Sequence, residues 1–246
     1  MTERFVRLAI RHSSRGFNVS DALDAAGRRV VLKEARALDA LGRQRFLREA
    51  RLGQQLRHSG LASVLDHDEG WIAFEPLEGS LASWPRIVDL AEARRVLERL
   101  AATLAYMHAC GVVHRDLKPA HVMFRGSEPV LIDLGVAGLA GDDPLEGAEI
   151  VGSPAWMAPE QALGAMPEPS ADIWSLCAVA HNLLTGRPLF AGSADAVLAM
   201  RSAGAMCRPY LTEIADPTLA AIVVAGLGPA KDRPSAAQIA AQLAAG

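Results

Sequence analysis

The hydrophobic pattern of this chain changes character at one point, and that change constrains the fold more than any other feature. Before it, residues 5–31 read as short strands and turns, and the β-branched run at residues 30–33 follows a glycine turn. Residues 43–57 place apolar side chains at steps of three and four, which predicts one amphipathic helix. A strand-like segment follows at residues 71–74. We therefore expect residues 1–74 to form a small, β-rich lobe with one helix.

The change falls at residues 75–79, a polar segment that contains Pro76 and Gly79. Neither residue favours a helix, so this segment is predicted to connect two lobes. Beyond it, residues 87–109 repeat apolar side chains with a period near 3.6, which predicts a long helix. The remaining sequence, residues 80–246, is therefore expected to form a larger and mainly helical lobe.

Two shorter features complete the prediction for this larger lobe. Residues 122–125 and 130–133 read as strands that are joined by a glycine turn. From residue 171 onward the helical pattern returns, in pieces that are separated at residues 185–188 and 228–229. The expected fold class is thus α+β, in one domain that spans residues 1–246.

Composition excludes several classes of protein. Half of the 246 residues are apolar and the net charge is only -3, which argues against a disordered chain and a dedicated nucleic-acid binder. Uncharged runs such as residues 100–113 are shorter than the roughly 20 residues that span a bilayer. Three widely spaced cysteines, Cys110, Cys177 and Cys207, predict buried thiols rather than disulfides or a zinc site. We expect a cytoplasmic protein that binds neither nucleic acid nor membranes, of undetermined oligomeric state.

Four short motifs carry the chemistry of the chain. Lys33 lies in an apolar strand, and residues 114–119 (HRDLKP) follow the long helix. Residues 133–135 (DLG) end a strand, and residues 152–160 (GSPAWMAPE) come next. In this order and at these separations, the motifs resemble those of protein kinases, in particular the bacterial serine/threonine kinases of eukaryotic type. The resemblance implies a two-lobed protein-kinase fold that binds ATP between the lobes.

The same resemblance implies roles for five residues. Phosphoryl transfer needs cations at the phosphates, a carboxylate on the metal ion and a carboxylate near the attacking hydroxyl group. By resemblance, Lys33 binds the α- and β-phosphates and is paired with Glu49. Asp116 orients the substrate hydroxyl and accepts its proton, and Lys118 contacts the transferred phosphate. Asp133 holds the metal ion. An unpaired ammonium in an apolar strand would be costly, which independently favours the pairing of Lys33.

The adenine site follows from the same comparison of positions. It is expected to have two valines as its roof, a methionine as its floor, a phenylalanine at its back, and two backbone groups of the connector that bond the base. These residues are Val19 and Val31, Met123, Phe74, and Glu75 with Leu77.

Three further residues have supporting roles by resemblance. Glu160 and Arg233 are expected to form an ion pair that ties the segment at residues 152–160 to the last helices. Asp172 is expected to bond the backbone of the loop that carries Asp116. These features favour a protein as the phosphate acceptor.

Two departures from the kinase pattern bear on activity. The three positions of the glycine-rich loop are His12, Ser14 and Phe17, while Gly16 is out of register. Glycines let backbone amides approach phosphates closely, so their loss predicts weaker nucleotide binding. His121 occupies the place of the asparagine that holds a second Mg²⁺ ion. Mg²⁺ prefers oxygen ligands, whereas an imidazole suits transition metals better. Three alternatives follow from His121: the protein uses Mn²⁺ as well as Mg²⁺, it works with a single metal ion, or it is inactive.

The segment between Gly135 and Gly152 contains no serine, threonine or tyrosine. Activation by phosphorylation there is thus excluded by sequence. Arg115, which in kinases often pairs with such a phosphate, has acidic residues of this segment as alternative partners, although these could equally form a solvated loop. The acidic residues are Asp142, Asp143, Glu146 and Glu149.

The sequence therefore predicts transfer of the γ-phosphate of ATP to serine or threonine of a protein. One alternative is a pseudokinase, a nucleotide-binding or scaffolding module without turnover, which the lost glycines and His121 suggest. The other is a small-molecule phosphotransferase of the same architecture, against which Lys118 and residues 152–160 argue.

Overall fold

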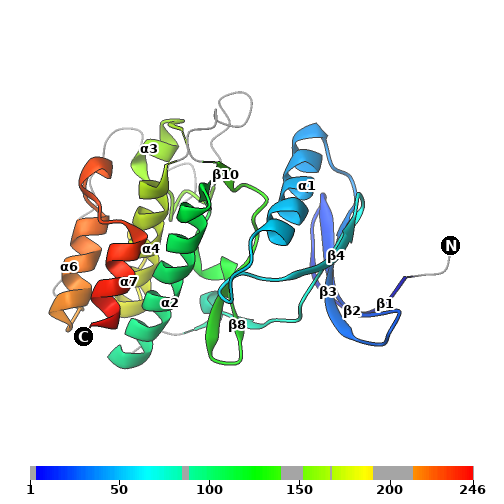
Figure 1. The fold of residues 1–246 in the computed structure, drawn as a ribbon, viewed down its shortest axis with the longest axis horizontal. Coiled ribbons are helices and arrows are strands. Elements are labelled where there is room, and N and C mark those ends of the chain that lie inside the picture. The colour runs from blue at the N-terminus through cyan, green and yellow to red at the C-terminus, as the bar shows by residue number, and fades with distance from the viewer. Residues whose placement is uncertain (1–3, 85–88, 140–151, 167, 191–212, 246) are drawn as a thin grey trace.

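The computed structural model describes residues 4–84, 89–139, 152–166, 168–190 and 213–245. Its elements form two lobes, as Figure 1 shows: a twisted sheet with helix α1 at one end of the molecule, and α2, α4, α6 and α7 side by side at the other. This confirms the predicted α+β, two-lobed architecture.

The first lobe is built on one antiparallel sheet with the strand order β1-β2-β3-β5-β4. Helix α1 (Ala40–Gln55) packs against it and begins at Asp39, whose side chain accepts a hydrogen bond from the Gly42 amide. Gly53 allows α1 to approach β4, because a Cβ atom there would lie 2.4 Å from a methyl group of Val64. The strands are β1 (Phe5–Ser13), β2 (Phe17–Asp24), β3 (Arg29–Ala35), β4 (Val64–Asp68) and β5 (Trp71–Phe74).

Two small sheets lie where the lobes meet. The first has the order β6-β8-β9, from β6 (Glu78–Ser80), β8 (Val122–Arg125) and β9 (Glu128–Leu131). The second pairs β7 (Val112–Val113) with β10 (Gly138–Leu139). Because β5 ends at Phe74 and β6 begins at Glu78, only three residues cross from the large sheet to this region.

The second lobe has its core between α2 and α4. Helix α2 is amphipathic, whereas α4 is buried on nearly every side, including the polar residues Asp172 and His181. The helices are α2 (Leu90–Ala109), α3 (Pro159–Ala162), α4 (Pro169–Thr185), α6 (Pro217–Gly226) and α7 (Ala236–Ala244). Short 3₁₀ turns occupy Leu81–Ser83, Pro119–His121 and Ala230–Asp232.

Within the described residues the predicted elements exist, with shifted boundaries. The strand expected at residues 130–133 ends at Leu131, because Asp133 takes a left-handed backbone conformation with φ 65° that no strand can contain. The prediction of buried thiols is wrong for Cys110, which is exposed just after α2, and right for Cys177. Cys207 lies outside the described residues. Among the helices that the structure describes, none is long and apolar enough to cross a membrane.

Candidate active site

A cavity of about 570 Å³ lies between the large sheet and the loops of the second lobe. This volume is within the usual range of small-molecule sites, about 300–1,000 Å³. Its walls bring together residues from five strands, from α1 and from the loop after α2. The predicted nucleotide and metal ligands lining it are Val19, Val31, Lys33, Glu49, Phe74, Glu75, Leu77, Lys118, His121, Met123 and Asp133.

A buried ion pair joins the sheet to α1 in this cavity. The Nζ atom of Lys33 lies 2.5 Å from Oε2 of Glu49, and their side chains are only 12% and 5% exposed. Burial by itself would lower the pKa of Lys33, but the carboxylates of Glu49 and Asp133 outweigh it and raise that pKa. Burial raises the pKa of Glu49 to about 7; Lys33 opposes the rise and Asp133 adds to it. Lys33 is therefore a cation held at the cavity wall.

The turn between β1 and β2 covers this cation with an aromatic ring. Phe17 places its ring 4.6 Å from Nζ of Lys33, which is a cation–π distance. The turn itself is closed by Ser14, whose backbone amide donates to the Phe17 carbonyl at 2.9 Å. His12 stacks obliquely on Phe17, with 5.7 Å between the ring centroids. Side chains thus occupy the place where a glycine-rich loop would offer bare backbone.

A buried carboxylate shapes the loop at residues 114–118. Asp172 of α4 accepts hydrogen bonds at 2.8 Å from the backbone amides of His114 and Arg115, as the sequence predicted. A third contact of its carboxylate, with Nε2 of His108 at 2.8 Å, was not predicted. These hydrogen bonds outweigh the effect of burial and lower the pKa of Asp172, so it stays ionised. The fixed backbone includes Arg115 in a left-handed conformation, φ 70°.

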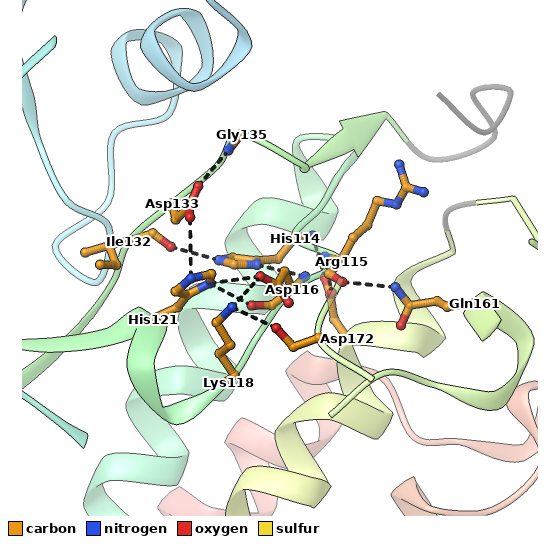
Figure 2. A network of polar contacts seen from close by, with 11 residues as sticks. His114, Arg115, Asp116, Lys118, His121, Ile132, Asp133, Gly135, Gln161 and Asp172 are labelled. Carbon is orange, nitrogen blue, oxygen red and sulfur yellow. Dashed lines mark hydrogen bonds and ion pairs between the residues drawn. The ribbon is translucent and has the colours of Figure 1, made fainter. Parts of the chain in front are cut away.

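Asp116 and Lys118 face each other across this loop (Figure 2). The ammonium of Lys118 donates to Oδ2 of Asp116 at 2.9 Å and to Oγ of Ser153 at 2.7 Å. Oδ1 of Asp116 is buried and has no hydrogen-bond partner in the described part of the chain. Since buried polar atoms are rarely left unpaired, this oxygen is a candidate acceptor for a substrate proton.

Asp133 and His121 lie beside this pair, as Figure 2 shows. Nδ1 of His121 is 2.9 Å from the carbonyl oxygen of Asp116, and its Nε2 is 3.4 Å from Oδ2 of Asp133. Burial would raise the pKa of Asp133, but Lys33 and His121 outweigh it and lower that pKa to about 2. Burial is the main reason that the pKa of His121 is lowered. Asp133 is therefore an ionised carboxylate that lies next to the buried His121 ring.

Another part of the cavity wall consists of apolar side chains. Val19, Val31 and Phe74 come from three strands of the large sheet, and Met123 of β8 is on the other side. This arrangement brings together the residues that the sequence predicted for adenine. The segment 75–77 forms the edge of the cavity, through Glu75 and Leu77.

Two arginines that the sequence did not predict hold the segment 75–77 in place by hydrogen bonds. Arg125 donates two hydrogen bonds to the Glu75 carboxylate, at 2.9 and 2.6 Å, and these contacts help to lower the pKa of Glu75 against the effect of burial. Arg11 of β1 donates to the carbonyl oxygen of Leu77 at 3.0 Å while it also binds Asp21. Arginine is the common basic residue of this chain, so nothing in the pattern distinguishes these two.

The predicted pair of Glu160 and Arg233 is present. Nη2 of Arg233 lies 3.0 Å from Oε2 of Glu160, and the arginine side chain is only 2% exposed. The same guanidinium donates to the carbonyl oxygens of Ser170 and Gly228, each at 2.9 Å. Gln161 donates to the carbonyl oxygen of Arg115 at 3.0 Å, so the segment after Gly152 is tied directly to the loop of Asp116.

The partners proposed for Arg115 lie outside the described residues; they are Asp142, Asp143, Glu146 and Glu149. Within the part that is described, the Arg115 side chain is buried, and its Nε atom has no hydrogen-bond partner. Burial lowers the pKa of Arg115, and the neighbouring cations Arg48 and Arg45 add to this effect.

Comparison with known proteins gives a consistent result. The family described as "Protein kinase domain" matches residues 16–224. The serine/threonine-protein kinase PknA of Mycobacterium tuberculosis is 34% identical over 162 residues, which cover 59% of this chain and 37% of PknA. The serine/threonine-protein kinase PkaA of Streptomyces coelicolor is 40% identical over 148 residues, 58% of this chain and 27% of PkaA. The matched region thus spans well under half the length of these relatives.

Proposed function

The chain belongs to the protein kinase family, and we propose that it transfers the γ-phosphate of ATP to serine or threonine residues of a protein. We assign residues 1–74 to the small lobe, 75–79 to the hinge and 80–246 to the large lobe of a single kinase domain. One observation carries the proposal: Lys33 with its partner Glu49, the ionised Asp133 and Lys118 line one cavity, and Lys118 is hydrogen-bonded to Asp116, whose Oδ1 atom has no hydrogen-bond partner among the described residues.

The cavity suits ATP and a divalent metal ion on its own chemistry. Its apolar end offers a slot for the base between Val31 and Met123, and its polar end holds the ammonium groups of Lys33 and Lys118. Asp133 and His121 would hold the metal ion, with Mg²⁺ or Mn²⁺ as candidates. When bound, the ion supplies positive charge that neutralises the phosphate oxygens.

The residues of the chain would then divide the work as follows. Lys33, kept charged and oriented by Glu49, binds the non-transferred phosphates. Oδ1 of Asp116 accepts a hydrogen bond, and then the proton, from the attacking hydroxyl group. Lys118 stays bound to Oδ2 of Asp116 and faces the transferred phosphate from the same side. The buried Asp172 keeps the loop in place throughout.

The segment after Gly152 provides the evidence for a protein substrate. Ser153 in this segment accepts a hydrogen bond from Lys118, and the ion pair of Glu160 and Arg233 fixes the end of the segment to the second lobe. Relatives that match this chain are named serine/threonine-protein kinases. The pseudokinase alternative is less favoured, because Lys33, Asp116 and Asp133 are all retained. Lys33 and Asp133 line the cavity, and Asp116 is hydrogen-bonded to Lys118 in its lining.

Turnover of ATP by the purified chain tests the proposal. ADP release and ³²P transfer to casein should both be measured with Mg²⁺ and with Mn²⁺, for the wild type and for Asp116→Asn. We expect the variant to lose at least about 100-fold in rate, which is the lower end of what a proton acceptor contributes. Asp68→Asn, at the exposed last residue of strand β4, is the matched control and should keep the wild-type rate. A wild type without turnover in either metal ion would favour the pseudokinase, and equal measurable rates in the wild type and Asp116→Asn would show that Asp116 is not the proton acceptor.

A further inference from the structure

An extra residue in strand β1 places an arginine at the segment 75–77. The pairing with β2 advances from Ile10 to His12 on β1 while it moves by only one residue on β2, so Arg11 forms a β-bulge. Bulges change the direction of a side chain and are frequent beside active sites. The Arg11 side chain lines the cavity, and its Nη1 atom donates to the carbonyl oxygen of Leu77 at 3.0 Å. A cation thus lies at the edge of the cavity.

Asp21 of β2 holds this guanidinium group in one orientation. Nε and Nη2 of Arg11 donate to the two carboxylate oxygens of Asp21, at 3.0 and 2.8 Å. Such a two-point contact fixes the plane of a guanidinium group, which a single ammonium group could not provide. The hydrogen bond from Arg11 is the main reason that the pKa of Asp21 is lowered, so Asp21 stays ionised at neutral pH. The position of Nη1 beside Leu77 is therefore supported from β2.

The segment 75–77 consequently offers few backbone groups to a ligand. The amide of Glu75 donates to the carbonyl oxygen of Ser63 at 3.1 Å, and Pro76 has no N–H group. Leu77 is thus the one residue of this described segment whose amide can donate to a ligand. The carbonyl oxygen of Leu77 already accepts from Arg11, so a ligand that approaches it meets a cation.

This set of groups suits adenine better than guanine. Adenine has an amino donor beside a ring nitrogen that accepts, and these match the carbonyl group of Glu75 and the amide of Leu77. Guanine has a carbonyl oxygen beside two neighbouring donors, a ring N–H and an amino group. If its oxygen accepts from the Leu77 amide, its donors need the Leu77 carbonyl oxygen, which Arg11 occupies. N–H groups would then face N–H groups, with no acceptor between them.

We propose that Arg11 sets the base specificity of the cavity: by occupying the carbonyl oxygen of Leu77, it disfavours guanine nucleotides and still admits adenine nucleotides. The inference rests on the proposed function, which supplies the nucleotide, and deepens it by naming a residue that selects the base. An unpaired polar group rejects the wrong ligand more strongly than the loss of an apolar contact does. Arg11 is such a repulsive element, built into the edge of the site.

Isothermal titration calorimetry with ADP and GDP tests this specificity without relying on phosphoryl transfer. The Kd of each nucleotide is measured with Mg²⁺ for the wild type, Arg11→Met and Asp21→Asn. Methionine keeps an apolar stem but removes the guanidinium group, whereas Asp21→Asn keeps that group and removes the carboxylate that orients it. Arg7→Met is the matched control, because Arg7 lies on the same strand, is bound to Glu34 and does not line the cavity.

We expect the wild type to bind ADP at least about tenfold more tightly than GDP, as one donor left without an acceptor would cause. Arg11→Met should lose this preference, Asp21→Asn should lose part of it, and Arg7→Met should keep it.

Equal affinities for ADP and GDP in the wild type, or an unchanged ratio in Arg11→Met, would overturn the inference and leave the proposed function standing. If Arg11→Met does not fold, an unchanged ratio in Asp21→Asn overturns it. Arg11-dependent selection of ADP by a chain that never transfers phosphate would support the inference and contradict the proposed function. A wild type that binds neither nucleotide would contradict both.

Discussion

The ammonium group of Lys33 and the carboxylate of Glu49 lie 2.5 Å apart, although one residue belongs to the central strand of a sheet and the other to the helix packed against it. Both side chains are almost completely buried. Taking charges out of water is costly, and the pair offsets that cost only while both partners are ionised. The stability of this buried contact therefore depends on the charge of both side chains.

Replacement of Lys33 by methionine should remove activity without unfolding the chain. Methionine keeps the apolar stem in β3 but removes the cation, so phosphoryl transfer should fall by at least about 100-fold, as for loss of one preorganised donor. Glu49 can take up a proton near neutral pH, since its pKa is raised to about 7 by burial, so no buried charge need remain unpaired. Circular dichroism checks that the variant is folded, and the transfer assay measures its loss of activity. Lys231→Met on the exposed 3₁₀ turn is the control, and undiminished transfer in Lys33→Met would show that Lys33 does not bind phosphate.

The raised pKa of Glu49 predicts a pH dependence. Below about pH 7 this carboxyl group is protonated and the ion pair is lost, so the transfer rate should fall as the pH drops through that value. Asp133 does not contribute, because its pKa is lowered to about 2 and it stays ionised over the whole range. Between pH 4.5, the ordinary value for Glu49, and about 7, the folded state binds more proton than the unfolded state. The contribution of Glu49 to stability therefore declines as the pH rises through this window.

Carboxyl ¹³C NMR of the ligand-free chain measures this pKa directly. One glutamate resonance should titrate near pH 7 and should be missing in Glu49→Gln. The variant should also be slower than the wild type at pH 8 and lack the fall in rate below pH 7. A spectrum in which every glutamate titrates near its ordinary pKa would contradict the assignment.

Removal of the Arg233 side chain should destabilise the second lobe. Its side chain is 2% exposed, and Arg233→Ala leaves Glu160 without its partner. Loss of one partner from a buried ion pair costs about 3–5 kcal/mol, so we expect a decrease of roughly 3 kcal/mol in the free energy of unfolding. Urea denaturation measures it. Arg29→Ala removes a 69% exposed arginine that lies 4.0 Å from Asp21, and it should change stability by less than about 1 kcal/mol. Equal effects of the two substitutions would refute the structural role of Arg233.

Activity should not depend on phosphorylation between Gly135 and Gly152, because that segment has no hydroxyl side chain. The nearest hydroxyl group, on Ser153, accepts a hydrogen bond from Lys118 at 2.7 Å. A phosphate group on Ser153 would therefore block the candidate active site instead of activating it. Phosphatase treatment should leave the transfer rate unchanged, with intact mass used to count phosphates. A large loss of activity that maps to Ser153 would disprove this prediction.

Much of the site was predictable because its signals are local. The apolar strand around Lys33, the period of α2 and the order of the motifs after it are set by neighbouring residues, whose spacing reports which face is buried. The same reasoning located Glu49, Asp116 and Asp133, since resemblance transfers positions along a sequence. It also identified the two unusual features, His121 and the absent glycines.

Only the tertiary structure decided which long side chains meet. Arg11 reaches Leu77 and Arg125 reaches Glu75 across 66 and 50 positions of the chain, and no sequence period records such contacts. Likewise, the sequence predicted by resemblance that His121 would hold a metal ion, but the 3.4 Å approach of its Nε2 atom to the Asp133 carboxylate depends on a backbone carbonyl group that contacts Nδ1. The local hydrophobic pattern of the sequence determines which residues are buried, because neighbouring residues of one element share its buried face. Which two side chains form a hydrogen bond depends on how the whole chain folds, because the partners are far apart in the sequence.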